Sequence, residues 1–192
     1  MKLEPITLPV LAQTPLGAYT QLSLGWPDVL PSPLPGQRLR LHDERELWPM
    51  RAPHAGQLEA LTNAPFPDNA ISLAELVGDA IPLAADQACV LVAEGLALAA
   101  LIHLCSTRRK APANTLALYQ ISEPAPFRPR PSRFFLPAMP AGAIAAIPLL
   151  EDWGIPSRLC AEDERPGCFT GRVDELAALL PPNPARRLLH LQ

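Results

Sequence analysis

ACVLVAEGLALAALIHLC, residues 88–105, is the stretch that decides the fold of this chain. It begins with the β-branched residues Val90 and Val92, and it passes through Glu94 and Gly95 into a run rich in alanine and leucine. β-Branched residues favour strands, glycine permits a tight turn, and alanine and leucine favour helices. The stretch therefore predicts a buried strand, a turn and a helix, which together form the first unit of an α/β sheet.

The same stretch approaches the ~20 apolar residues that a membrane-spanning helix needs. Glu94 argues against a span, because a charge near the centre of a bilayer costs about 2.5–3.5 kcal/mol on insertion scales. Gly95 interrupts the run directly after it. We therefore expect a strand and a helix of a soluble domain, and no membrane partner.

Strand and helix patterns alternate along the rest of the back half. The predicted strands are Thr115–Ile121, Ser157–Ala161 and Arg187–Leu191. The predicted helices are Ala141–Trp153, which Pro148 must start, kink or split, and Val173–Leu180. Proline has this effect because it lacks a backbone N–H and clashes with the preceding turn. The alternation predicts a parallel sheet with right-handed crossovers.

The front half consists of short apolar runs separated by turn residues. The candidate strands are Ile6–Leu11, Ala18–Leu24, Gln37–Leu41, Gly56–Leu61 and Ala80–Leu83. Ser72–Val77 predicts a short helix, since Ser72 stands three residues before Glu75 in a capping-box spacing. Many short strands predict a small antiparallel barrel or sandwich. The chain is thus expected to be α/β overall, with a β-barrel in residues 1–86 and a truncated parallel α/β nucleotide-type domain in residues 87–192.

Composition and charge exclude several classes of function. The 192 residues are 48% apolar and 18% charged, which is typical of a globular protein. The net charge of −3 gives no electrostatic basis for binding nucleic acid or an anionic membrane. The 25 prolines disfavour long helices across most of the chain.

The reactive residue types form no recognised motif. The four cysteines contain no C-x-x-C pair, and no secretory signal precedes them, so we expect free thiols in a cytoplasmic protein with Cys89 and Cys105 buried. The four histidines show no i, i+4 pairing, which predicts no metal site. No nucleophile–base motif occurs either, so no catalytic residue is predicted.

The order of several short motifs resembles the ferredoxin–NADP reductase superfamily, and most closely the electron-transfer subunit of dihydroorotate dehydrogenase. The motifs are Pro35-Gly36-Gln37, Gly56-Gln57-Leu58-Glu59, Leu76–Ile81, Val90–Gly95 and Gly167–Val173. The resemblance covers residues 5 to 191. It implies a flavin-type barrel that binds FAD or FMN, followed by a nicotinamide-binding domain.

The flavin-binding residues of that family are altered in this chain. The family carries an arginine, a proline, an aromatic or aliphatic residue and a serine, where this chain has Trp48-Pro49-Met50-Arg51. Tryptophan cannot replace the forked guanidinium that binds a pyrophosphate. Arg51 is a candidate to reach the phosphate from a shifted position, although a salt-bridged arginine is the ordinary alternative. Ser72 is a second candidate, for which helix capping is the ordinary alternative.

The nicotinamide element departs further from the family. Gly95 is the remaining glycine of a region that is glycine-rich in relatives, and Leu96 and Ala97 add side chains where the backbone must approach the cofactor. Glu94 places a carboxylate where phosphates arrive, at a cost of about 1–4 kcal/mol at ~4 Å. The four clustered cysteines that an iron–sulfur cluster requires near the chain end are absent as well.

The sequence leaves two main hypotheses of function, and a third that has less support. The preferred hypothesis is a reductase-like module that has lost nicotinamide binding and flavin binding and acts as an accessory or interaction protein, with a protein partner or as a homo-oligomer. The alternative is a functional flavin-dependent electron-transfer subunit, an oxidoreductase. The third is a protein that binds another small molecule in the former flavin groove. Fold alone does not choose between them.

Overall fold

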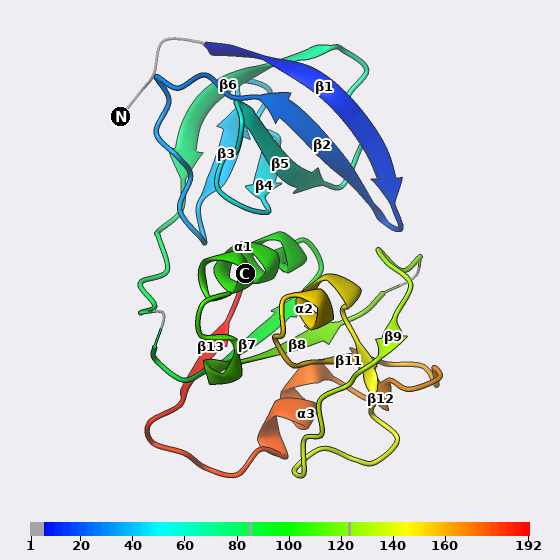
Figure 1. Cartoon of the computed structure of the whole chain (residues 1–192). Helices are drawn as coiled ribbons and strands as arrows, with labels where there is room; N and C mark the ends of the chain where they lie inside the picture. The colour runs from blue at the N-terminus through cyan, green and yellow to red at the C-terminus, as the bar shows by residue number, and fades with distance from the viewer. Residues whose placement is uncertain (1–5, 85, 123) are drawn as a thin grey trace.

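The front half of the molecule is a closed, six-stranded antiparallel barrel (Figure 1). The computed structural model describes residues 6–84, 86–122 and 124–192. The barrel strands follow the order β1-β2-β5-β4-β3-β6. Their bounds are β1 Ile6–Leu16, β2 Tyr19–Gly25, β3 Arg38–Leu41, β4 Glu46–Pro49, β5 Gln57–Thr62 and β6 Ala70–Val77.

Alternating side chains of these strands fill the barrel, as the period of a half-buried strand requires. On β2, Leu22 and Leu24 are fully buried, whereas the residue between them is only half-buried. Leucines at inward positions of the other five strands complete this core: Leu8, Leu39, Leu41, Leu47, Leu58 and Leu73. These leucine side chains fill the interior of the barrel and exclude water from it.

Two local predictions in the front half are wrong. Residues 72–77 form part of strand β6 and not a helix, because β6 closes the barrel by pairing with both β1 and β3. Ser72 is paired with Thr7 of β1, so the capping-box spacing is coincidental. Residues 80–83, predicted as a strand, lie in the connection to the second half. Tertiary strand pairing has overridden the local sequence signal at both places.

The back half is a five-stranded parallel sheet in the order β12-β11-β8-β7-β13. The strands of this sheet are β7 Cys89–Glu94, β8 Thr115–Gln120, β11 Ser157–Ala161, β12 Phe169–Thr170 and β13 Arg187–His190. The helices are α1 Ala97–Thr107, η1 Pro112–Asn114, α2 Pro148–Asp152 and α3 Val173–Ala178, and β9 Arg130–Pro131 pairs with β10 Ala145–Ala146. The predicted fold class, an antiparallel barrel followed by a parallel α/β sheet, is confirmed.

Residues 88–105 adopt the strand, turn and helix that the sequence predicts. Pro148 begins α2, so the predicted helix of residues 141–153 is shorter at its amino end, and part of that segment is strand β10. Within the described residues, no helix is long and apolar enough to cross a membrane, and α1 has 11 residues.

The sheet has a topological switch point at β7. Strands β8, β11 and β12 follow one another on one side of β7, whereas β13 returns to its other side. The carboxyl ends of β7 and β13 therefore flank the crevice in which open α/β sheets usually bind ligands. Helix α1 covers the face of the sheet turned toward the barrel, and α3 packs on the opposite face (Figure 1).

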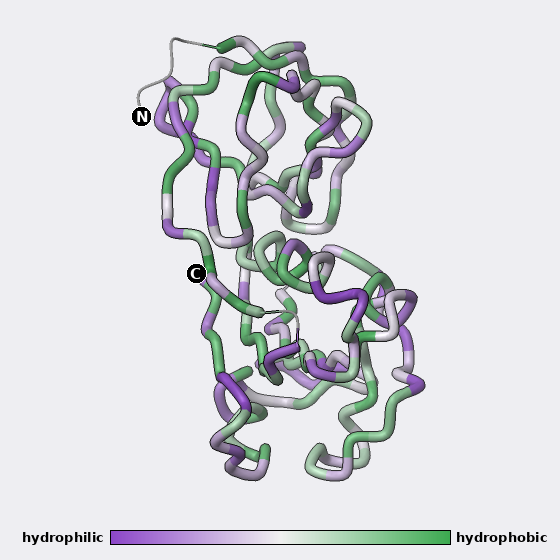
Figure 2. The backbone as a smooth tube through the Cα atoms, turned by 60° about the vertical axis from the view of Figure 1, so that its left-hand side comes forward, coloured by the Kyte–Doolittle hydropathy of each residue, from purple (hydrophilic) through white to green (hydrophobic). Residues whose placement is uncertain are grey.

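The barrel and the sheet share one apolar core. Met50 and Leu61 of the barrel belong to the same buried cluster as α1, and their side chains are 6% and 0% exposed. Figure 2 shows that hydrophobic segments run through both halves of the chain. Where Met50 and Leu61 meet α1, the interface between the two halves is therefore packed like a protein interior.

Candidate cofactor site between the barrel and the sheet

The turn at Gly95 is the place where a dinucleotide phosphate would approach a fold of this kind. It joins the carboxyl end of β7 to the first turn of α1, whose backbone N–H groups attract anions. Gly95 has a φ of +58°, in the left-handed region that favours glycine. Glu94, the last residue of β7, is exposed beside the turn. The geometry of the turn suits phosphate, but the neighbouring carboxylate opposes it.

Two tyrosines meet at this turn, one from each half of the molecule. The Tyr119 hydroxyl, at the sheet, donates a hydrogen bond to the Gly95 carbonyl at 3.2 Å. The Tyr19 hydroxyl, from the barrel, lies 4.0 Å from the position that a Cβ on Gly95 would take. Burial raises the pKa of Tyr119, and the neighbouring Tyr19 hydroxyl adds to this effect as the smaller cause. We call this arrangement the tyrosine pair.

The tyrosine pair is the feature that sequence reasoning missed. These are the only two tyrosines in the chain, yet each stands in an ordinary strand pattern. Nothing in the local sequence indicates that they face one another. Tyr19 is 8% exposed and Tyr119 is fully buried, so both belong to the protein interior.

A hairpin of the barrel holds Tyr19 in place. The Ala18 N–H donates to the Pro124 carbonyl at 3.0 Å, which ties the β1–β2 turn to the loop that follows β8. A Cβ on Gly17 would lie only 2.3 Å from the Ala125 carbonyl oxygen, so this close approach requires glycine. The Phe127 ring then packs against Tyr119, with ring centroids 6.2 Å apart.

The run predicted to carry the flavin determinants lies on β4 and directly after it. Met50 is buried in the shared core, and Trp48 packs against the edge of that core. The guanidinium of Arg38 lies 5.0 Å from the centre of the Trp48 ring, a distance typical of a cation–π contact. Protein side chains therefore already contact both residues of this run.

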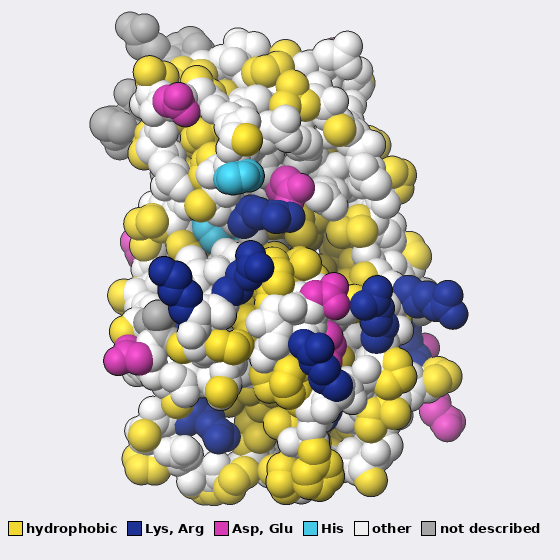
Figure 3. Space-filling model, in the orientation of Figure 1, with side chains coloured by type: hydrophobic (Ala, Val, Ile, Leu, Met, Phe, Trp, Pro, Cys, Tyr) yellow, Lys and Arg dark blue, Asp and Glu magenta, His cyan; other side chains and the backbone are white. Residues whose placement is uncertain are grey.

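Arg51 forms an ion pair with Glu59 of the neighbouring strand β5. The other barrel arginines are paired in the same way: Arg38 with Glu46 at 3.1 Å, and Arg40 with Glu75 at 3.2 Å and Glu46 at 3.4 Å. Figure 3 shows basic and acidic side chains interspersed with hydrophobic ones over one face of the molecule. In the barrel, the charges of Arg38, Arg40 and Arg51 are thus neutralised by carboxylates of the chain itself.

Ser72 and Arg51 are not brought together. Ser72 lies beyond the Leu41 end of β3, since the His42 N–H donates to its carbonyl at 3.0 Å. Strand β4 leads to Arg51. It runs toward the Arg38 end of β3, which is opposite to the Leu41 end. At ~3.3 Å per strand residue, the two positions are roughly 20 Å apart along the strands. A single pyrophosphate cannot contact both side chains.

The residues present therefore do not fit the phosphate site that the resemblance implies. Of the three sequence candidates, Arg51 is ion-paired with Glu59, Ser72 lies at the far end of the barrel, and Gly95 is half-buried beside the exposed carboxylate of Glu94. No helix begins between β5 and β6 within the described residues. A cofactor phosphate at Arg51 would have to take this side chain from Glu59.

The cysteines and histidines are also distributed rather than clustered. Over residues 6–84, 86–122 and 124–192, no group of three or more metal-ligating side chains is found. All four cysteines are free, with Cys89 and Cys105 buried as predicted. Burial is the main cause that raises the pKa of the Cys160 thiol, to about 12. These thiols are poor nucleophiles, because only the thiolate reacts readily.

Solved structures with this architecture include reductase domains. The FAD/NAD-binding domain of the nitric oxide dioxygenase of Vibrio cholerae matches with a TM-score of 0.63 and 13% identity, over 96% of this chain and 97% of that domain. The flavohemoglobin of Malassezia yamatoensis, solved with FAD and heme, matches with a TM-score of 0.67 and 10% identity. The Amycolatopsis reductase GcoB matches with a TM-score of 0.69 and 14% identity.

These likenesses show that the protein has the ferredoxin reductase-like fold. The match covers 98% of this chain but 53% of the flavohemoglobin, and 97% of this chain but 61% of GcoB. No protein-family model matches the chain, and no curated protein sequence does either. The particular likeness to the dihydroorotate dehydrogenase subunit remains a prediction.

Proposed function

We propose that this protein is a reductase-fold module that has lost nicotinamide and flavin binding and acts as an accessory or interaction protein. The observation that carries the proposal is the exposed carboxylate of Glu94 at the Gly95 turn, because it repels the phosphate that a nicotinamide cofactor would place there. The partner is another protein or a second copy of this chain, contacted through the outer surfaces of the barrel and sheet.

The cost of admitting a nicotinamide cofactor supports the proposal. A phosphate at the Gly95 turn would approach the exposed carboxylate of Glu94, at a cost of about 1–4 kcal/mol at ~4 Å. This cost falls on the end of the cofactor for which dinucleotide-binding folds provide stabilising contacts.

Flavin binding is opposed by the contacts of β4. A flavin phosphate would have to take Arg51 from Glu59, leaving that carboxylate beside the phosphate. The flavin ring would have to separate Met50 and Leu61 from α1, which exposes buried apolar surface at ~25 cal/mol per Å². The existing contacts thus favour a cofactor-free protein.

The test is the visible absorbance of freshly purified protein, followed by titration calorimetry with FAD, FMN, NADH and NADPH. We expect no flavin bands and no measurable heat of binding. A low-micromolar dissociation constant for any of the four would contradict the proposal. Circular dichroism of the same samples checks that the protein is folded, so a negative titration is informative.

A functional flavin-dependent electron-transfer subunit is the second candidate. Its support is that the similarity to FAD/NAD-binding domains extends over nearly the whole chain. If flavin copurifies and Arg51 holds its phosphate, Arg51→Ala should remove the flavin. Ser72→Ala is the matched variant, since Ser72 lies too far from Arg51 to share that phosphate. Flavin that is retained in both variants would exclude both residues as ligands.

A further inference from the structure

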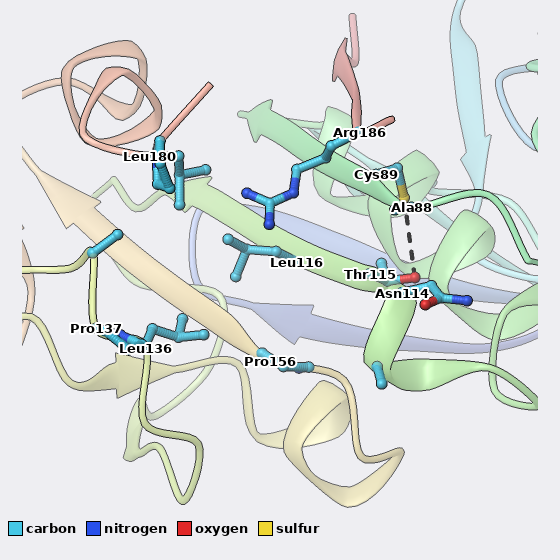
Figure 4. A pocket seen from close by; sticks show the side chains of 13 residues that line it. Ala88, Cys89, Asn114, Thr115, Leu116, Leu136, Pro137, Pro156, Leu180 and Arg186 are labelled. Atoms are coloured by element: carbon cyan, nitrogen blue, oxygen red, sulfur yellow. Dashed lines mark hydrogen bonds between the residues drawn. The ribbon is translucent and has the colours of Figure 1, made fainter. Parts of the chain in front are cut away.

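A cavity of about 330 Å³ opens at the amino edge of the sheet, away from the Gly95 turn (Figure 4). It is lined where β7 and β8 begin, by Cys89 and Thr115, and just before β11 begins, by Pro156. Segments from the 136–138 loop and from the chain after α3 close its other sides. The volume is at the lower end of the range for small-molecule sites.

Most of the cavity wall is apolar. Leu116, Leu136 and Leu180 line it from three different segments, together with Pro137 and Pro156. Figure 4 shows these side chains arranged around a common space. A ligand in this cavity must therefore have an apolar body, since polar groups against these walls would lose their hydrogen bonds to water.

Arg186 provides a single charge at the cavity. Its side chain extends over Leu116, between Leu180 and Cys89 (Figure 4). The residue is half-buried, and no carboxylate pairs with it in the part of the chain that the structure describes. A guanidinium next to an apolar wall forms its strongest hydrogen bonds with a carboxylate or phosphate.

A second arginine adds positive charge behind the wall. Arg108 is fully buried, and its Nε donates to the Thr115 hydroxyl at 2.7 Å. Its other donors bind the carbonyl oxygens of Ala84, at 2.5 Å, and Gln87. All three acceptors are neutral, so its charge is not cancelled by them. The positive charge of Arg108 therefore lies directly behind Thr115, which lines the cavity.

We infer that this cavity binds a small monocarboxylate with an apolar body. The carboxylate binds Arg186, and the apolar body lies against the leucines and prolines. One accessible guanidinium in a mainly apolar cavity matches one negative charge better than the several charges of a nucleotide. The site lies on the edge of the sheet opposite the Gly95 turn, so it does not depend on the proposed loss of cofactor binding.

The experiment uses octanoate as the probe and octan-1-ol as its uncharged counterpart. Titrations are followed by two-dimensional NMR of the whole, isotope-labelled protein. We expect octanoate to shift the amide signals of residues 113–116 and 180–186, and to bind roughly tenfold or more tightly than octanol. Shifts confined to the Gly95 turn or to the barrel would overturn the assignment, as would an absence of binding at millimolar octanoate.

Two matched variants test the role of the charge. Arg186→Gln should weaken octanoate binding roughly tenfold to hundredfold and leave octanol binding within about twofold. Arg187→Gln is the control, because the side chain of Arg187 donates to the Pro82 carbonyl and does not line the cavity. Equal effects of the two variants on octanoate would show that Arg186 is not the ligand. Leu180→Ala should weaken both probes, which tests the apolar wall separately.

Discussion

His103 should make the stability of this protein depend on pH in the mildly acidic range. It lies in α1, is 1% exposed, and its Nδ1 has no hydrogen-bond partner among the described residues. Burial lowers the pKa of His103 from 6.5 to about 4, because the charged imidazole is disfavoured in the core. The folded protein therefore binds this proton much less readily than the unfolded chain does.

The sign and size of the effect follow from proton linkage. Above pH 6.5 the histidine is neutral in both states, so His103 causes no loss of stability there. As pH falls from 6.5 toward 4, the unfolded state takes up a proton that the folded state does not, and stability falls by ~1.4 kcal/mol per pH unit. We therefore expect a loss of about 2 kcal/mol at pH 5 and about 3 kcal/mol near pH 4.

Urea unfolding followed by tryptophan fluorescence at pH 7.5, 6.0 and 5.0 measures this dependence. His103→Leu removes the titrating group and replaces it with a side chain suited to the core. We expect the variant to match the wild type at pH 7.5 and to exceed its unfolding free energy by about 2 kcal/mol at pH 5. His54→Gln, at an exposed position, is the control for replacing a histidine outside the core.

Comparison of variant and wild type isolates His103 from the carboxylates, which titrate in both proteins. A wild-type loss below ~0.5 kcal/mol between pH 7.5 and 5 would refute the reasoning, because protonation would then be equally easy in both states. So would an identical pH slope in wild type and His103→Leu.

Three further results are expected from urea unfolding at pH 7.5. Tyr119→Phe should cost about 1–3 kcal/mol, since it removes a buried hydrogen bond at the tyrosine pair; an unchanged midpoint would argue against that contact. Arg108→Gln should cost about 3 kcal/mol or more, because three buried acceptors lose their donors, whereas the exposed Arg109→Gln should cost less than ~1 kcal/mol. Gly17→Ala should cost more than ~1 kcal/mol through a clash with the Ala125 carbonyl and a positive φ of +62°; no loss would show that the hairpin adjusts freely.

Much of the back half was predictable because its signals are local. The strand at residues 157–161 has the bounds that the sequence indicates, and residues 88–105 contain the predicted strand, turn and helix in that order. Buried parallel strands are continuous apolar runs, and proline or glycine marks their limits. Pro148 likewise marks the start of α2, which short-range sterics require.

The sequence predicted an antiparallel barrel, but it did not predict every strand of that barrel. Residues 72–77 carry a capping-box spacing, and only the closure of the barrel selects the strand. An edge-free barrel needs a sixth strand between β1 and β3, and β6 supplies it. That requirement is a property of the whole sheet, so no local window reveals it.

By itself, the sequence determined the first strand–turn–helix unit and the change from barrel to parallel sheet. Only the tertiary structure decided that Tyr19 meets Tyr119 over Gly95, that Arg51 pairs with Glu59, and that Arg186 faces an apolar cavity. The physical reason is the separation along the chain over which each kind of interaction acts. Backbone preferences and periodicity act between near neighbours in the chain, whereas these contacts join side chains that only the packing of barrel, sheet and loops brings together.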